Sequence, residues 1–193
     1  MNIHQFLDAD TLAQTLGLLP SPGLLLAAAS PSGGANVMTI GWTTFGVAWN
    51  RPVCMVMVRP TRYTFTLIEE SGAFTVNVPT SDMDDVLDFC GHNSGRDVDK
   101  IRVLGLAFSP AKTIDSISLS DCSLTYECRV VGKHDISSNM LAKEVLLDHY
   151  KGGTREGNYH RVYLGEILNI QKKGDMPYDN NTNFERNRGQ TLP

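Results

Sequence analysis

Residues 36–64 read NVMTIGWTTFGVAWNRPVCMVMVRPTRYT. This stretch contains two apolar runs, at 37–47 and 53–58, in which apolar residues alternate with small polar ones. A turn-forming cluster, Asn50-Arg51-Pro52, separates the two runs. The pattern predicts a β-hairpin-like pair of strands. Both runs end in groups suited to binding a planar, phosphorylated ligand.

The second run leads into a polar corner made of Arg59, Thr61, Arg62 and Tyr63. We expect residues 63–70 to form an amphipathic helix that has Thr61 as its N-cap and ends at Gly72. Free N–H groups at a helix N-terminus favour anions, and arginine can bind phosphate oxygens in a bidentate way. A solvated strand-to-helix corner is the alternative interpretation. The helix N-terminus, hydroxyls and arginines together favour a phosphate site.

The composition is that of one globular domain spanning residues 1–193. The 193 residues are 41% hydrophobic and 20% charged, with a net charge of −4. This acidic balance argues against nucleic acid as a partner, since binding nucleic acid requires many basic contacts. The longest apolar run, at 23–29, is too short to span a bilayer, and the first residues lack a basic signal-peptide region. We therefore expect a cytoplasmic protein without a membrane partner and with its four cysteines reduced.

Short apolar segments recur along the chain and predict a mainly β protein with helical additions. Strands are expected at 23–29, 73–78, 114–119, 123–131 and 162–170, and helices at 10–19, 81–90 and 140–150. The N-terminal helix, within residues 8–20, should pack Leu12, Leu16 and Leu19 on the barrel. The tail at about 172–193 is polar, so it is either mobile or lies across another surface. Frequent short strands with inserted helices favour an antiparallel barrel over a βαβ sheet.

Several common catalytic and nucleotide-binding motifs are absent from the sequence. None of the 17 glycines forms a G-x-G pattern, which excludes the Rossmann fingerprint, and the sequence contains no P-loop. The five histidines form no H-x-x-x-H pair, so we expect no metal site. There is also no G-x-S-x-G elbow. Any nucleotide site in this chain must be of another kind.

Six segments in order resemble the flavin reductase-like family, and flavoredoxin-like proteins most closely. They are NVMTIGWTTFG, VRPTRYT, FTVNVP (74–79), CGHNSGRDVDK (90–100), YECRVV (126–131) and HRVYLGEIL (160–168). Members of this family bind FMN in a split β-barrel. The resemblance covers residues from about 24 to 170 and is weakest at both ends and between 137 and 157. It implies an FMN-binding split β-barrel and a homodimer.

The resemblance also implies positions for the cofactor. The flavin ring is expected at Met38, Thr39, Ile40, Gly41, Trp42 and Thr43, although the same alternation fits a plain half-buried strand. Gly41 would allow the ring to approach the backbone closely, and the peptide groups of residues 39–43 could match its pyrimidine edge. Trp42 could border the ring or simply fill the core. The phosphate is expected at the corner that contains Arg59 and Arg62.

Two further positions are candidates on the same basis. Ser94 and Lys100, from a second basic patch, are expected on the phosphate side, and a solvated charge run is the alternative. His160 is a candidate for contacting nicotinamide or substrate, although a lone histidine is more often structural. Cys90 carries no sequence sign of a lowered pKa, so we assign it no redox role.

The resemblance leaves three functions open. The first is an FMN-dependent electron carrier of flavoredoxin type, which serves redox protein partners. The second is a flavin or ferric reductase that takes a hydride from NAD(P)H onto flavin N5. The third is a flavin- or haem-binding module without turnover. The first two make the protein an oxidoreductase, and the sequence names neither the donor nor the acceptor.

Overall fold

The structure of the protein is a computed structural model that describes residues 8–152 and 156–173. Its helices are α2 (Ala9–Gly17), α3 (Tyr63–Ser71), α4 (Asp84–His92), α5 (Lys100–Leu104), the 3-10 turn η1 (Ser138–Met140) and α6 (Lys143–Tyr150). Its strands are β1 (Leu24–Ala29), β2 (Ala35–Ile40), β3 (Thr43–Ala48), β4 (Arg51–Val58), β5 (Ala73–Val78), β6 (Phe108–Pro110), β7 (Ile117–Leu119), β8 (Leu124–Asp135) and β9 (Arg161–Lys172). The mainly β fold with helical additions is confirmed.

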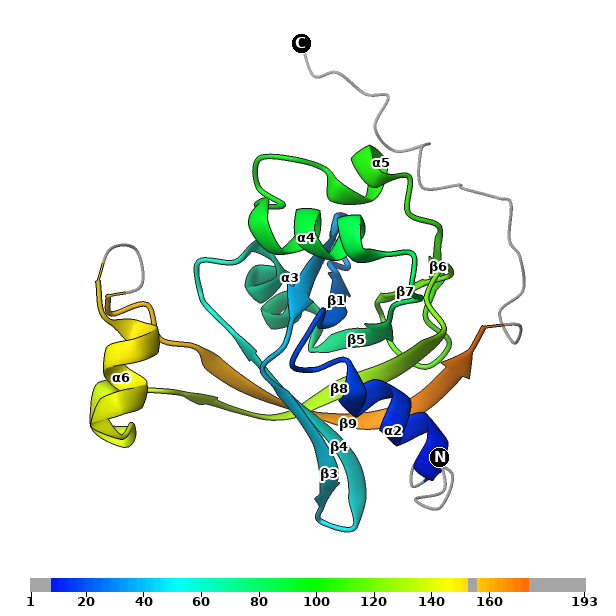
Figure 1. Cartoon of the computed structure of the whole chain (residues 1–193). Coiled ribbons are helices and arrows are strands. Elements are labelled where there is room, and N and C mark those ends of the chain that lie inside the picture. The colour runs from blue at the N-terminus through cyan, green and yellow to red at the C-terminus, as the bar shows by residue number, and fades with distance from the viewer. Residues whose placement is uncertain (1–7, 153–155, 174–193) are drawn as a thin grey trace.

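The main sheet curls because of how its two edges are connected. Seven strands lie in the order β2-β1-β5-β8-β9-β4-β3, and every pairing in that sheet is antiparallel. The edge strands β2 and β3 are joined by only Gly41 and Trp42. The end of β2 and the start of β3 are three residue steps apart, at most about 11 Å, so the two edges of the sheet must come together at this joint. The sheet is therefore curled, with its edge strands β2 and β3 drawn together where they are joined; the curled strands are seen in Figure 1.

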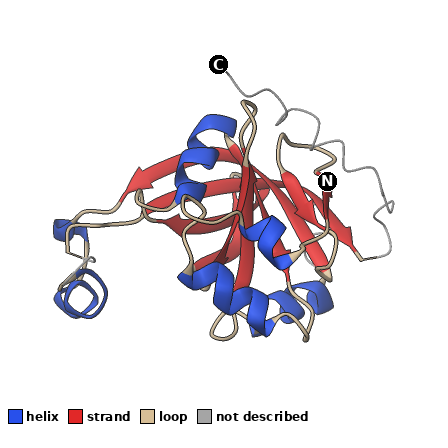
Figure 2. Cartoon of the chain, turned by 90° about the horizontal axis from the view of Figure 1, so that it is seen from above, coloured by secondary structure: helices blue, strands red, loops and turns tan. Residues whose placement is uncertain are grey.

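Around β1 and β5, both faces of the sheet are buried. Leu24 and Leu26 of β1 join a core that also contains Val56 of the distant strand β4, so this core fills the inside of the curled sheet. Helix α3 adds Leu67 and Ile68 to it. The alternate β1 residues, including Leu25 and Ala27, pack outward against α4, α5 and β7. Helices therefore lie on more than one side of the strands, as Figure 2 shows.

The hairpin predicted in residues 36–64 forms, with two corrections. The run 37–47 is not one strand, because it breaks at Gly41 and Trp42 into β2 and β3 at opposite edges of the sheet. The hairpin turn consists of Trp49 and Asn50, whose φ angles are 52° and 56°. A two-residue turn with positive φ at both positions matches the twist of the flanking strands. Arg51 and Pro52, predicted in the turn, belong to β4.

The N-terminal helix is confirmed, but its predicted apolar face is wrong in part. Leu16 is 45% exposed, whereas Thr11 and Thr15 are buried. The Thr15 hydroxyl lies 2.7 Å from the hydroxyl of Tyr126 in β8. This buried hydrogen bond explains why a polar residue, and not Leu16, faces the barrel.

Other boundaries also differ from the predictions. Helix α4 starts at Asp84, later than the predicted start at residue 81, and it continues past the predicted end at residue 90 to include Gly91. Helix α6 starts at Lys143, because residues 138–140 form a 3-10 turn. The strand expected at 114–119 covers only Ile117–Leu119. The predicted tail from 174 onward lies outside the described residues.

Strands β8 and β9 are longer than predicted and form an arm. Each has twelve residues. Their outer ends extend away from the barrel and carry α6, seen in yellow at the left of Figure 1. None of the helices in the described residues is long and apolar enough to span a membrane.

Candidate functional site

Helix α3 begins at the predicted phosphate corner without a side-chain cap. Its cap position is Arg62, not the predicted Thr61, and no cap hydrogen bond comes from the Arg62 side chain. The Thr61 hydroxyl instead accepts a hydrogen bond from Asn158 at 3.0 Å. The Arg62 guanidinium is exposed and has no hydrogen-bond or ion-pair partner among the described residues. The first turn of α3 and Arg62 thus offer N–H donors and a positive charge at one place.

The loop that carries Ser94 lies beside this helix start. Arg96 donates to the Thr66 hydroxyl at 3.0 Å, and its guanidinium lies 5.4 Å from the centre of the Tyr63 ring. The Ser94 hydroxyl accepts the Arg96 backbone N–H at 3.1 Å. The fold therefore brings the second basic patch to the first turns of α3.

Gly95 allows this loop to approach β2. A Cβ atom at Gly95 would lie 2.1 Å from the Asn36 amide oxygen, so a larger residue would clash. The Asn36 amide in turn donates to the Thr64 hydroxyl at 2.7 Å. The loop, β2 and α3 are thus held together through one buried asparagine.

Lys100 is directed into the protein. It is 3% exposed, and its ammonium donates to the carbonyls of Val37 at 2.7 Å and Cys90 at 2.8 Å. Burial lowers its pKa, and the nearby Arg62 charge lowers it further. Two of the three ammonium protons thus link β2 to the last turn of α4. The predicted contact of Lys100 with a phosphate stays a prediction.

The segment predicted to border the flavin ring uses most of its side chains within the protein. The Thr39 hydroxyl donates to the Leu87 carbonyl, and the Thr43 hydroxyl donates to the Met55 carbonyl at 2.6 Å. Ile40 is buried, Met38 packs against the inner core, and Trp42 is 43% exposed. A Cβ atom at Gly41 would lie 3.1 Å from the Leu19 carbonyl oxygen, so the N-terminal segment also favours glycine there.

The backbone of this segment is better placed for a ligand than its side chains. Strands β2 and β3 are the two edges of the sheet, so each has a row of N–H and C=O groups without a neighbouring strand in that sheet. Gly41 and Trp42 join them outside any strand. Backbone groups and the exposed indole are therefore what remains for a ring to contact.

Arg59 and His160 form a second cluster with residues from the distal arm. Arg59 donates to His160 Nε2 at 3.3 Å, to the Asn158 carbonyl at 3.1 Å and to the His149 carbonyl at 3.2 Å. His160 is 8% exposed, and its Nδ1 lies 2.8 Å from the Tyr150 hydroxyl. Burial and the charges of Arg59 and Arg62 lower the pKa of His160 to about 4. His160 is therefore neutral near pH 7, with both ring nitrogens engaged.

Sequence reasoning missed His149, Tyr150 and Asn158 in this cluster. They come from residues 137–160, mostly where the resemblance is weakest, and they show no pattern beyond an ordinary helix end followed by Gly152. The charges of Arg59 and Arg62 lower the pKa of His160, and the Trp42 ring centre lies 5.0 Å from the His160 ring. These four side chains therefore lie in one region of the structure. Arg62 also acts on Lys100, which extends the region toward β2 and α4.

The family model described as flavin reductase like domain matches residues 16–188 of the chain. This chain belongs to the flavin reductase-like family. A relative in Archaeoglobus fulgidus, an uncharacterised protein, is 30% identical over 135 residues, which are 70% of this chain and 64% of the relative. The match thus spans less than two thirds of that relative.

Solved structures agree with the family assignment of this flavin reductase-like protein. Flavoredoxin from Methanosarcina acetivorans is 28% identical, with a TM-score of 0.61, covering 78% of this chain and 68% of that one. An FMN-binding protein from Thermus thermophilus shares the fold with a TM-score of 0.60 at 18% identity, covering 79% of this chain and 71% of that one. The split β-barrel and the likeness to flavoredoxin, both predicted from the sequence, are confirmed.

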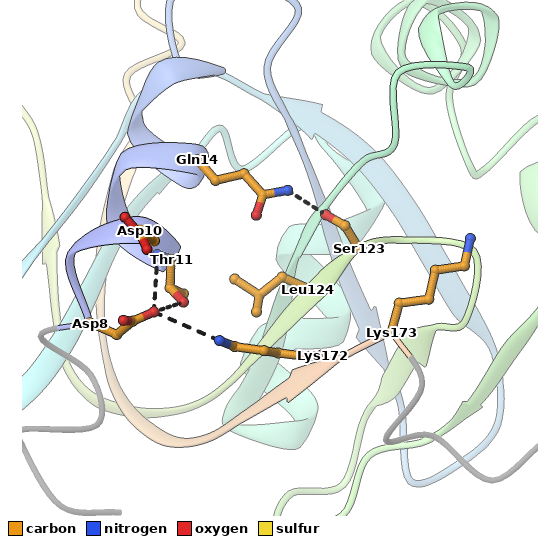
Figure 3. Close-up of a pocket in the computed structure, with 8 residues that line it drawn as sticks. All are labelled: Asp8, Asp10, Thr11, Gln14, Ser123, Leu124, Lys172 and Lys173. Atoms are coloured by element: carbon orange, nitrogen blue, oxygen red, sulfur yellow. Dashed lines mark hydrogen bonds and ion pairs between the residues drawn. The ribbon is translucent and has the colours of Figure 1, made fainter.

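A separate cavity of about 300 Å³ lies between α2 and the ends of β8 and β9 (Figure 3). Eight residues line it: Asp8, Asp10, Thr11, Gln14, Ser123, Leu124, Lys172 and Lys173. Asp8 pairs with Lys172 at 3.7 Å, and Gln14 donates to the Ser123 hydroxyl at 3.1 Å. None of the predicted site residues lines this cavity, and its polar groups largely bind one another. We assign no ligand to it.

Proposed function

We propose that this flavin reductase-like protein binds FMN and transfers electrons through it, as a carrier of flavoredoxin type. The observation that carries the proposal is the arrangement around Arg62. An uncapped helix N-terminus and an exposed guanidinium lie in the same region as the joint between two sheet edges, where backbone groups and Trp42 remain available. A phosphate at the helix and a planar ring at the joint would use these groups together.

In this proposal each part of the site has a defined task. Arg62, Tyr63 and the first N–H groups of α3 hold the phosphate, with Ser94 from the neighbouring loop. The backbone of residues 38–43 orients the ring, and Trp42 borders it. Bound FMN would supply the redox chemistry, and the protein would supply binding and orientation.

Identifying the flavin tests the proposal directly. The purified protein is expected to carry non-covalent FMN, because the site offers one compact phosphate position and the sequence has no dinucleotide fingerprint. Denaturation followed by chromatography of the released flavin measures this. Release of FAD alone, or no flavin after incubation with FMN, would overturn the proposal.

Replacing Arg62 by alanine should weaken FMN binding without unfolding the protein. A hydrogen bond to a charged group contributes about 1.5–3 kcal/mol, so the dissociation constant should rise about tenfold to a hundredfold. Titration of flavin-free protein with FMN measures the change. Arg51→Ala, at the other end of β4, removes the same charge and should leave FMN affinity unchanged. An unchanged constant in Arg62→Ala would place the phosphate elsewhere.

The reductase interpretation remains the second candidate, and the exposure of Trp42 favours it. An indole that is 43% exposed leaves room for a nicotinamide ring beside the flavin. Against it, both nitrogens of His160 are already bound, so the histidine has no free nitrogen for a substrate. Stopped-flow mixing with NADH or NADPH separates the candidates. A fast, saturable loss of flavin colour would select the reductase, and reduction by a ferredoxin-like protein alone would select the carrier. No reduction by either donor would leave the flavin- or haem-binding module.

We also propose that the protein is a homodimer. The β3–β4 hairpin exposes Val47 by 50% and Trp49 by 66%, and the arm exposes Met140 and Leu147. Projecting apolar groups of this kind commonly mark an interface. Light scattering at micromolar concentration should report a dimer, and Trp49→Lys should shift it toward monomer. A wild-type monomer under these conditions would contradict the proposal.

A cytoplasmic location and a redox protein or nicotinamide nucleotide as partner complete the proposal. All four cysteines are free thiols, which suits a reducing compartment.

A further inference from the structure

The hydrogen bonds around His160 have a fixed direction. An arginine N–H can only donate, so His160 Nε2, which receives the Arg59 Nε–H at 3.3 Å, must be the unprotonated nitrogen. The neutral ring then carries its proton on Nδ1. That proton donates to the Tyr150 hydroxyl oxygen 2.8 Å away. Arg59 and Tyr150 together set the tautomer and the orientation of the His160 ring.

The oriented His160 ring is one of the aromatic rings that lie against Trp42. The Trp42 ring centre lies 5.0 Å from that of His160 and 4.9 Å from that of His149 at the end of α6. Tyr150 meets His160 edge-on at 5.6 Å and stacks on Tyr159 at 5.0 Å. The Trp42 indole therefore rests on side chains that belong to the far end of the arm.

The position of the Trp42 side chain depends on these ring contacts, because the backbone at Trp42 is not held by the hydrogen bonds of a strand. It lies in the two-residue joint between β2 and β3, outside both strands, so the ladder hydrogen bonds of the sheet do not fix it. Aromatic pairs at these distances favour defined edge-on or tilted geometries. A change in the tilt of His160 would therefore be transmitted to the indole.

We propose that Tyr150 is a positioning residue for the flavin ring, which acts through His160 on Trp42. This inference rests on the proposed function, in that Trp42 borders the bound ring. The hydroxyl of Tyr150 holds His160, His160 and His149 hold the indole, and the indole forms one wall of the ring site. Helix α6, outside the part of the chain with the strongest resemblance, thereby becomes part of the cofactor site.

Comparing two flavins separates an effect on the ring from an effect on the phosphate. Riboflavin has the ring of FMN but no phosphate, so a ring-positioning residue must affect both ligands equally. We expect Tyr150→Phe to weaken the binding of FMN and riboflavin by the same factor, about two- to tenfold, the size expected for one neutral hydrogen bond. Arg62→Ala should weaken FMN alone. Equal binding of riboflavin to wild type and Tyr150→Phe would overturn the inference, as would a loss confined to FMN.

Tyr159→Phe is the matched control. It removes the same hydroxyl from the ring stacked on Tyr150, and the Tyr159 hydroxyl has no hydrogen bond to the described residues. We expect this variant to bind both flavins as the wild type does. An equal loss in Tyr159→Phe would mean that general packing of the arm, and not the Tyr150–His160 bond, supports the ring.

A second readout needs no flavin. In flavin-free protein, NMR of the His160 ring nitrogens reports the tautomer, and the indole N–H signal of Trp42 reports its surroundings. Tyr150→Phe should shift both signals, and Tyr159→Phe should shift neither. If Tyr150→Phe does not fold, His149→Ala on the exposed end of α6 should move the Trp42 signal and weaken both flavins. An unmoved indole signal would refute the inference, whereas failure of the wild type to bind any flavin would refute the proposed function.

Discussion

Replacing Arg59 by alanine should lower the free energy of unfolding by about 2–4 kcal/mol, since hydrogen bonds from charged groups contribute about 1.5–3 kcal/mol each and are not additive. Within the described part of the chain, the guanidinium donates to His160 Nε2 and to the carbonyls of Asn158 and His149. It also lies 5.4 Å from the centre of the Tyr150 ring. Its removal leaves a buried histidine nitrogen without a donor, while the two carbonyls can recover water. Urea unfolding measures the loss.

Hydrogen exchange locates the effect of this substitution. Arg59 joins the end of β4 to the residues that flank α6, so amides of α6 such as that of Leu146 should lose protection first. Arg59→Lys should recover only part of the stability, because a single ammonium cannot reproduce a planar fork of donors. Arg51→Ala is the control, since Arg51 is exposed and pairs only with Glu166 among the described residues. If both alanine variants cost the same, Arg59 does not hold the arm.

The role of Arg59 shows where sequence reasoning reached its limit. The VRPTRYT segment predicted the corner and the helix that follows it correctly. The sequence prediction placed both arginines at the phosphate, because two arginines near a helix N-terminus look alike in sequence, and for Arg59 a phosphate contact stays a prediction. Their difference comes from residues 149–160, which supply the acceptors for Arg59 and leave Arg62 exposed. Contacts this distant in sequence cannot be read from a local pattern.

The limited reach of local sequence patterns also explains the main error in the predicted strands, which is the single run at 37–47. Alternation in residues 37–47 predicts strand conformation correctly, and both β2 and β3 are strands. Periodicity reports only which side each residue faces, and it continues through Gly41 and Trp42. It does not report which neighbour each strand pairs with. The break between β2 and β3 follows from closing the sheet, a property of all seven strands.

Lys100 is buried, although a lysine in such a sequence is usually exposed to solvent. A lysine beside a Ser-Gly-Arg loop is usually solvated, and the family pattern placed it near the phosphate. Here two carbonyls replace its water, and one of them is at the negative end of α4. A buried lysine is tolerated because both contacts are charge-assisted. Burial on this scale depends on the packing of α4 and α5 against β2, which no short motif encodes.

Acidification should destabilise the protein through His160 before the carboxylates titrate. The pKa of His160 falls from its ordinary value of 6.5 to about 4 because of burial and the neighbouring charge of Arg59. The unfolded chain therefore binds this proton more readily than the folded one. The contribution of neutral His160 to the free energy of unfolding is fully present above pH 6.5 and declines as the pH falls toward 4. One pH unit corresponds to about 1.4 kcal/mol, so about 2 kcal/mol should be lost between pH 6.5 and 5.

His160→Gln provides the control for this pH dependence. Glutamine does not titrate, and its amide can accept from Arg59 through oxygen while donating to Tyr150 through nitrogen. Glu127 also has a lowered pKa, because hydrogen bonds from Thr113 and the Lys112 backbone outweigh the effect of its burial, so its contribution is lost only below about pH 4.5. Urea unfolding at pH 6.5 and pH 5 should therefore show a smaller difference in the variant than in the wild type. Equal differences in the two proteins would mean that His160 is protonated in the folded state, and that the Arg59–His160–Tyr150 chain does not have the direction assigned to it.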